Sequence, residues 1–210
     1  MNRKEIKSKA REIIKGNKWL ILKPIVYILI LDFIGSFLGN FIDGLMNVKS
    51  EDTLTIGSTI TYIWSLITGM ISVAYYVYIL KFIRTGSACV NDVVDCFKKK
   101  WKEIFVAQLL VTIFVMLWSL LFVVPGIIAV YAYVWAFVLV VDENLKPRDA
   151  INKSKLMMKG NKWNYFVFEL SFMGWNILAI LTLGILYIWL YPYMLVSNML
   201  YYEKLKELNN

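Results

Sequence analysis

The chain has 210 residues, of which 59% are hydrophobic and only 18% are charged, and its mean hydropathy is +0.59. This composition excludes an ordinary soluble domain of that length and is typical of an integral membrane protein. The formal charge of +8 would elsewhere favour nucleic-acid binding, but the lysines and arginines stand in short segments that flank apolar runs. Anionic lipid headgroups attract basic residues in such positions, so we predict a membrane partner and no nucleic acid.

Six continuous apolar runs follow one another along the chain. Runs of about 20 residues suit membrane-crossing helices, whereas a membrane β-barrel would need shorter segments of alternating polarity. We therefore predict an all-α, polytopic protein in which residues 1–210 form a single integral membrane domain. The predicted spans cover residues 20–40, 57–80, 104–124, 126–141, 164–182 and 185–202. The fourth run, of roughly sixteen residues, is short enough for a re-entrant or shifted helix to be an alternative to a full crossing.

The first basic segment, residues 1–18, is predicted to be an interfacial amphipathic helix on the inner leaflet. Its apolar residues recur at helical spacing, with lysines and arginines on the other faces; they are Ile6, Ala10, Ile13 and Ile14. The apolar run that follows carries Lys23, Pro24 and Asp32 and has no small-residue cleavage site. We therefore interpret it as a retained span rather than a signal peptide.

A Lys-Trp pair ends each of three basic segments and opens an apolar run; the pairs are Lys18-Trp19, Lys100-Trp101 and Lys162-Trp163. Lysine stays with water and lipid phosphate, while a tryptophan ring settles at the headgroup boundary. The pairs are therefore predicted to be interface anchors that fix where the chain enters the bilayer.

Asp32 lies deep in the first span, where insertion of a carboxylate costs roughly 2.5–3.5 kcal/mol. It could belong to a proton or cation relay or to the floor of a substrate cavity, or it could be a neutral or hydrogen-bonded acid that holds helices together. Both interpretations stay open. Gly35 and Gly39 form a G-x-x-x-G spacing that allows close helix approach. We favour packing within the molecule over packing between two copies.

Two further basic segments repeat the pattern of the first. The apolar face of the second consists of Val90, Val93, Val94 and Phe97, and that of the third of Ala150, Ile151, Met157 and Met158. The sequence Lys-Gly-Asn-Lys-Trp occurs at residues 15–19 and again at 159–163. This recurrence favours a repeated module made of an interfacial helix and a hairpin, with three modules at approximately residues 1–80, 86–141 and 147–202.

Helix-breaking residues predict tight reversals inside two of the hairpins. Pro125 and Gly126 stand between the third and fourth runs, and Gly184 stands between the fifth and sixth. Neither reversal carries a charge, so each is predicted to turn without a long polar loop.

The distribution of positive charge predicts the orientation in the membrane. Of the 23 lysines and arginines, seven lie in residues 1–18, six in 81–102, six in 146–162 and two after residue 203. By the positive-inside rule these segments share the cytoplasmic side, so both termini are predicted to be cytoplasmic.

The sequence offers little for catalysis, and we predict that the protein is not an enzyme. Histidine is absent, and there is no Gly-rich phosphate loop, zinc-protease motif or serine-hydrolase elbow. Cys89 and Cys96 lack a second pair to complete a zinc site, so we expect reduced, structural cysteines and no metal or cofactor. Glu169, in the fifth span, is expected to be structural; a cation path that it would share with Asp32 is a further hypothesis.

A series of short segments runs through the second half of the chain: Val124-Pro125-Gly126-Ile127, Ala150-Ile151, Ser154-Lys155, Met158-Lys159-Gly160, Leu170-Ser171-Phe172, Gly174-Trp175, Leu181-Thr182-Leu183-Gly184-Ile185, Trp189-Leu190-Tyr191-Pro192-Tyr193 and Tyr201-Tyr202-Glu203. With the basic opening from Arg3 to Trp19, this series resembles a bacterial integral-membrane family catalogued as domain of unknown function 975. The resemblance covers nearly the whole chain, most specifically from residue 124 onward. It implies a multi-span protein of the bacterial plasma membrane and brings no activity or catalytic residues with it.

These observations favour a non-enzymatic plasma-membrane protein that acts as an accessory or envelope-maintenance component. Its basic cytoplasmic face would dock to anionic lipid headgroups, to a membrane protein partner or to a second copy of the chain. A small-molecule or ion transporter, or a permease subunit, that uses Asp32 is the first alternative. Protection against a membrane-active peptide is the second.

Overall fold

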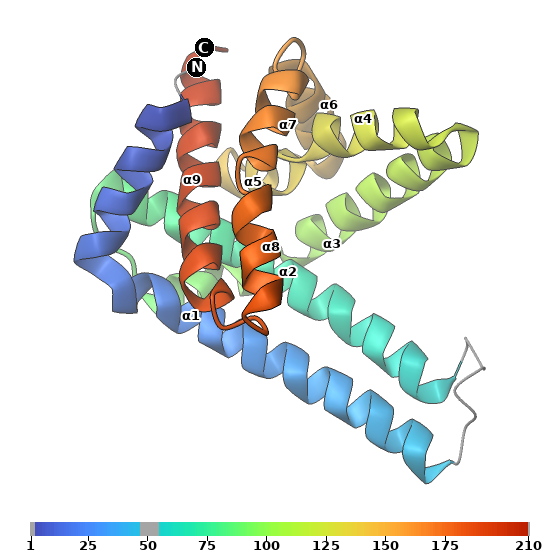
Figure 1. Cartoon of the computed structure of the whole chain (residues 1–210). Coiled ribbons are helices and arrows are strands. Elements are labelled where there is room, and N and C mark those ends of the chain that lie inside the picture. Colours follow the sequence, from blue (N-terminus) through green and yellow to red (C-terminus); the bar gives the residue numbers. More distant parts are fainter. Residues whose placement is uncertain (1–2, 47–54, 210) are drawn as a thin grey trace.

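The structure, a computed structural model, describes residues 3–46 and 55–209. Within these ranges the chain folds into α-helices and contains no strand, which confirms the all-α prediction for the described part. The helices are α1 (Arg3–Leu45), α2 (Ile56–Thr85), α3 (Val90–Leu121), α4 (Val123–Tyr133), α5 (Ala136–Asp142), α6 (Pro147–Met157), α7 (Lys162–Leu170), α8 (Met173–Leu181) and α9 (Tyr187–Glu207). Figure 1 shows the first and last helices side by side, with the two ends of the chain next to each other.

Five helical segments in the described part are long and apolar enough to cross a membrane: Arg3–Leu45, Ile56–Thr85, Val93–Leu120, Val123–Asp142 and Lys162–Leu181. By length and composition the chain is therefore a multi-pass membrane protein. The sixth predicted span, 185–202, falls within α9, where several tyrosines together with Ser197 and Asn198 lower the hydropathy. The count of six crossings stays a prediction.

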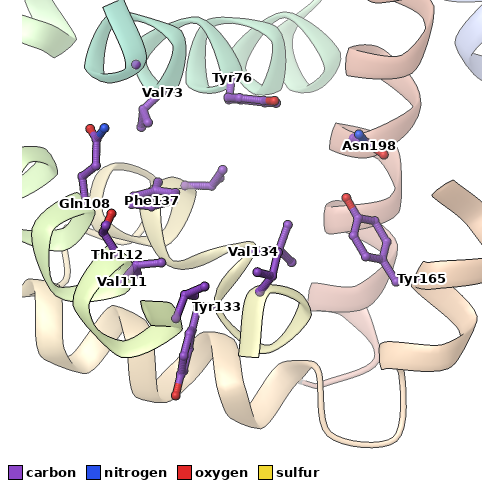
Figure 2. Close-up of a pocket in the computed structure, with 14 residues that line it drawn as sticks. Val73, Tyr76, Gln108, Val111, Thr112, Tyr133, Val134, Phe137, Tyr165 and Asn198 are labelled. Atoms are coloured by element: carbon purple, nitrogen blue, oxygen red, sulfur yellow. The ribbon is translucent and has the colours of Figure 1, made fainter. Parts of the chain in front are cut away.

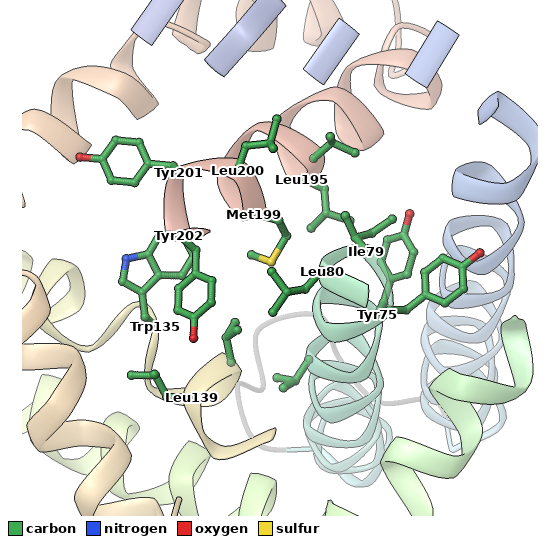
Figure 3. Close-up of a cluster of buried hydrophobic side chains, with 14 of the residues drawn as sticks. Tyr75, Ile79, Leu80, Trp135, Leu139, Leu195, Met199, Leu200, Tyr201 and Tyr202 are labelled. Carbon is green, nitrogen blue, oxygen red and sulfur yellow. The ribbon is translucent and has the colours of Figure 1, made fainter. Parts of the chain in front are cut away.

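The buried core lies where α2, α5 and α9 meet (Figure 3). Trp135 packs between helices, with its ring centroid 5.3 Å from that of Tyr202 on α9. Away from this core, Figure 1 shows the α1–α2 and α3–α4 hairpins extending in different directions. Exposed apolar side chains cover their outer parts, among them Phe33, Phe37 and Phe41 of α1. Such a surface suits lipid rather than water.

Helix α1 consists of two helical segments joined at Asn17, whose backbone is not helical (φ −134°, ψ 31°). The kink separates the predicted amphipathic segment from the predicted first span. Ile6 and Ala10 of the first segment are buried, and this part of α1 runs along α9 (Figure 1). The apolar face therefore packs against protein, and only the remaining faces of the segment are open to lipid.

The α1–α2 hairpin is held together by a close approach of the two backbones. A Cβ atom on Gly39 would lie 2.7 Å from the carbonyl oxygen of Gly57, and one on Gly57 would lie 2.1 Å from the carbonyl oxygen of Gly39. A Cβ on Gly35 would lie 1.9 Å from the Trp64 ring, whose Nε1 donates to the Leu31 carbonyl at 2.8 Å. The structure thus uses the G-x-x-x-G spacing for packing within the molecule.

An acid that the sequence did not single out closes the open end of the same hairpin. Asp43 of α1 accepts a hydrogen bond from the Gly57 amide at 2.9 Å and another from the Thr55 hydroxyl at 2.7 Å. Thr55 also caps α2 through a reciprocal pair of bonds with Ser58. A carboxylate near a helix N-terminus is favourable because the first amides have no intrahelical partner.

The fourth apolar run is broken in its middle, between α4 and α5. Ser154 of α6 bridges the break: its Oγ donates to the Ala132 carbonyl at 2.9 Å and accepts from the Trp135 amide at 3.2 Å. The apolar face of α6 is buried at the same place, and it consists of Ala150, Ile151, Met157 and Met158. The third amphipathic segment therefore packs on protein and supplies the hydrogen bonds that the broken helix lacks.

The chain reverses at Gly184 as the sequence indicated, but the earlier reversal lies at Phe122, between α3 and α4, ahead of Pro125 and Gly126. Pro125 and Gly126 lie in the first turn of α4, where a Cβ on Gly126 would lie 2.3 Å from the Ser119 hydroxyl oxygen of α3. Gly184 has a φ of +85°, and its amide donates to the Ala179 carbonyl at 2.8 Å, which ends α8 and directs the chain into α9.

Candidate functional site

Charged side chains from α2, α5, α6 and α9 meet in one cluster, which we call the ionic junction; it consists of Arg84, Asp142, Glu143, Lys153, Tyr202, Glu203 and Lys206. Asp142 is at its centre, with a side chain that is only 4% exposed. Its carboxylate accepts hydrogen bonds from the guanidinium of Arg84, from the Tyr202 hydroxyl at 2.8 Å and from the Lys206 ammonium at 2.8 Å. A buried carboxylate is thus satisfied by donors from two other helices.

The charges of the junction hold one another in their ionised forms. Burial alone would raise the pKa of Glu143, but hydrogen bonds from Lys153 and Lys206 bring it below its ordinary value. Burial alone would lower the pKa of Lys206, but its bonds to Asp142 and Glu143 raise it instead. These groups are therefore charged at neutral pH and act as a fixed clamp between helix ends.

Three of the four basic segments of the chain contact the short segment 142–144. Arg84 and Lys100, both from the second basic segment, bond to Asp142 and Asn144 respectively. Lys153 from the third segment pairs with Glu143, and Lys206 from the last pairs with Asp142. The first segment joins them through α9, since Glu5 and Lys9 line a shallow pocket together with Glu203 and Lys204. The start of the first segment therefore lies at the same end of the molecule as the other three, whereas Lys18, at its far end, lies beside Trp189 near the start of α9.

Sequence reasoning used these charges for orientation and missed the junction itself. The available signal was positional: Asp142 and Glu143 follow one apolar run directly, Arg84 comes near the end of a second, and Lys206 follows the last. Opposite charges at the ends of neighbouring spans are brought together when the spans pack.

A cavity of about 450 Å³ lies between α2, α3, α4, α5, α7 and α9 (Figure 2). Its wall is mostly apolar and is rich in valine. The lining residues that carry a polar side-chain group are Tyr76, Gln108, Thr112, Tyr133, Tyr165 and Asn198. A cavity of 300–1,000 Å³ with apolar walls and a few polar groups is typical of small-molecule sites.

The structure places Glu169 and Asp32 in different surroundings. Glu169 is partly buried on α7 and lies beside Asn198 and Tyr165, two residues that line the cavity. Asp32 is exposed on α1, and its electrostatic neighbour is Tyr191 of α9. Neither acid lines the cavity, and the structure brings only Glu169 close to it.

The three predicted anchor pairs each present their tryptophan at the surface, since Trp19, Trp101 and Trp163 are all exposed. The lysines differ. The ammonium of Lys18 lies 5.3 Å from the centroid of the Trp189 ring, Lys100 bonds to Asn144 of the junction region, and Lys162 is partly buried. The pairs thus combine exposed rings with lysines that contact the protein.

Comparison with known proteins gives one match. No curated protein and no solved structure matches this chain. The model of one family, described as a protein of unknown function (DUF975), matches residues 1–136 and residues 123–209. The two matches together cover almost the whole sequence. The chain therefore belongs to the DUF975 family of proteins of unknown function.

Proposed function

We propose that this protein is a non-enzymatic, multi-pass component of the bacterial plasma membrane, with an accessory or envelope-maintenance role. Its basic cytoplasmic face docks to anionic lipid headgroups. The observation that carries the proposal is the convergence of three basic segments on residues 142–144. Gathering most of the positive charge at one end of a membrane protein creates an attractive surface for the anionic inner leaflet.

The ionic junction uses only some of the basic side chains in these segments. Further basic side chains from the same segments are exposed, among them Lys98, Lys99, Lys102, Arg148, Lys155 and Lys159. Each lysine or arginine near an anionic surface contributes about 1 kcal/mol to membrane attraction. The exposed set therefore supplies the docking surface, while the junction residues hold the helices that carry it.

The same convergence supports the topology. Because three basic segments and the start of the first share one end, we assign that end, with both termini, to the cytoplasm by the positive-inside rule. The spans then form three hairpins, and the turn at Gly184 between α8 and α9 faces the outside.

Cysteine labelling tests this topology. In a Cys89→Ser, Cys96→Ser background, we expect Leu183→Cys, in the exposed turn after α8, to react with a membrane-impermeant maleimide on intact cells. Asn152→Cys, exposed on α6, is expected to react only after the membrane is permeabilised. Labelling of Asn152→Cys on intact cells would contradict the assigned orientation.

Lipid retention tests the docking. Native mass spectrometry of the protein from nanodiscs that contain phosphatidylglycerol and phosphatidylcholine is expected to show preferential retention of phosphatidylglycerol. In a Lys98→Gln, Lys99→Gln variant, the free-energy preference for phosphatidylglycerol over phosphatidylcholine is expected to fall by about 2 kcal/mol, which lowers the retention ratio of the two lipids roughly thirtyfold. The matched Lys98→Arg, Lys99→Arg variant keeps both charges and is expected to behave as the unmodified chain.

Equal retention of the two lipids by the unmodified chain would refute docking to anionic headgroups. Copurification of a stoichiometric protein from the native membrane, with no lipid preference, would move the docking role from lipid to that protein.

A further inference from the structure

The polar atoms around the 450 Å³ cavity are short of hydrogen-bond donors. Gln108 Oε1 and Asn198 Oδ1, both from lining residues, are buried and have no partner among the described residues. The same holds for Oε1 of Glu169, which lies beside Asn198. A buried acceptor without a donor is unfavourable, so three such atoms around one cavity favour a ligand that donates.

The polar groups are arranged unevenly along the cavity. Figure 2 shows the hydroxyls of Tyr76 and Tyr165 directed toward Asn198 at one end, and Gln108 on the far side. Apolar side chains, including those of Val73, Val134 and Phe137, separate the two. The cavity therefore suits an amphiphile with a polar head at the Asn198 end and an apolar body between the valines.

The acidic group next to the polar end is Glu169. The side chains of Asn198 and Tyr165 hydrogen-bond to it, and no lysine or arginine lines the cavity. The basic residue whose charge acts on Glu169 is Lys7. Its ammonium, however, donates to the Ser171 carbonyl at 3.3 Å and lies 3.9 Å from the centroid of the Phe172 ring. No ion pair of the described residues includes Glu169, so its carboxylate is available to a cation that binds beside Tyr165 and Asn198.

The cavity reaches the apolar surface of the protein. Thr112 of α3 and Val130 of α4 line it and are also exposed. Figure 1 shows α3 and α4 diverging from their connection toward the centre of the molecule. A ligand with an alkyl chain can therefore enter sideways, from the lipid, between these two helices.

We propose that this cavity binds an amphiphile that carries a primary ammonium group. An ammonium has three donors and no acceptor, which matches the unpaired oxygens of Asn198 and Glu169 and the hydroxyl of Tyr165. Its charge pairs with Glu169, and its alkyl chain occupies the apolar part of the cavity, toward Val111 and Val134. This site does not depend on the proposed lipid docking, because it involves none of the exposed lysines.

The test compares ligands that share one tail. Octylammonium, octyltrimethylammonium and octanol are titrated against the full chain in a neutral detergent, with bound ligand counted by native mass spectrometry. We expect saturable binding of one octylammonium per chain. Octyltrimethylammonium has the charge but no N–H donor, and octanol has a donor but no charge. We expect each of them to bind at least roughly tenfold more weakly than octylammonium.

Three variants locate the site. Glu169→Gln is expected to weaken octylammonium binding roughly tenfold while leaving octanol unchanged. Val111→Phe, which fills the cavity from α3, is expected to abolish binding of all three. Val106 lies on the same helix, is exposed and does not line the cavity. The matched control variant Val106→Phe is therefore expected to bind octylammonium as the unmodified chain does.

If octanol bound as tightly as octylammonium, the proposed preference for a cation would be wrong. The unpaired oxygens at the polar end of the cavity would then be hydrogen-bonded by ordered water. Octylammonium binding that survives Val111→Phe would place the ligand elsewhere. The ligand series on the unmodified chain decides the cation preference even where Val111→Phe fails to fold. Anionic-lipid retention is measured separately, so loss of one proposal does not affect the other.

Discussion

Asp142→Asn is expected to lower the free energy of unfolding by about 3 kcal/mol, because it removes the central charge of the ionic junction. The Asp142 side chain is 4% exposed and takes donors from Arg84, Tyr202 and Lys206. Removing one member of a buried charge network leaves the others uncompensated, which costs about 3–5 kcal/mol. We expect the lower end because Arg84 is 38% exposed and keeps Glu203. Unfolding in mixed micelles measures the change.

The control for this prediction is Asp149→Asn, which removes the same charge from an exposed position on α6. Exposed substitutions of this kind change stability by no more than about 0.5 kcal/mol. Equal stability of Asp142→Asn and Asp149→Asn would show that the junction does not hold the helix ends together. A double variant with Arg84→Gln is expected to cost less than the sum of the single changes, since the two residues share one interaction.

Gly57→Ala is expected to separate α1 from α2 and to cost about 3 kcal/mol, the upper part of the range for overpacking. The added Cβ would meet the Gly39 carbonyl oxygen at 2.1 Å, and the obstructing atom belongs to the backbone, which cannot rotate away as a side chain can. It would also disturb Asp43, which accepts the Gly57 amide. The thermal unfolding midpoint in detergent measures the loss.

Other glycines of the hairpin provide graded controls. Gly35→Ala is expected to cost less than Gly57→Ala, because the obstructing group is the Trp64 side chain, which can move. Gly44→Ala meets nothing within 4 Å and is expected to gain about 0.5–1 kcal/mol from the better helix propensity of alanine. If Gly57→Ala were as stable as Gly44→Ala, the close backbone contact would not contribute to the hairpin.

The sequence predicted those features of the fold that depend on local pattern. Hydropathy gave the helical class, the reversal at Gly184 depends on a local backbone preference, and helical spacing identified Ile6 and Ala10 as one apolar face. The same spacing could not show whether lipid or protein covers that face, because both are apolar partners for a helix. The break between α4 and α5 was also hidden, since residues 123–141 are continuously apolar and the compensating serine lies in α6.

The candidate sites depend on contacts between distant parts of the chain. Arg84 and Lys206 are 58 and 64 residues from Asp142, so no window of sequence contains the junction. Glu169 was visible as an acid in an apolar run, but its position beside Asn198 follows from the packing of α7 on α9. Asp32 was visible for the same reason, yet α1, on which it lies, contributes no residue to the cavity lining.

The bridge that Ser154 makes between α4 and α5 has a consequence for biogenesis. Broken helices persist at membrane depth only where other protein groups satisfy their free amides and carbonyls. The Ala132 carbonyl and the Trp135 amide obtain their partner from α6, which the ribosome synthesises about 20 residues later. We therefore expect the break between α4 and α5 to lack its hydrogen-bond partner until α6 has been synthesised, so that folding of α4 and α5 waits for α6.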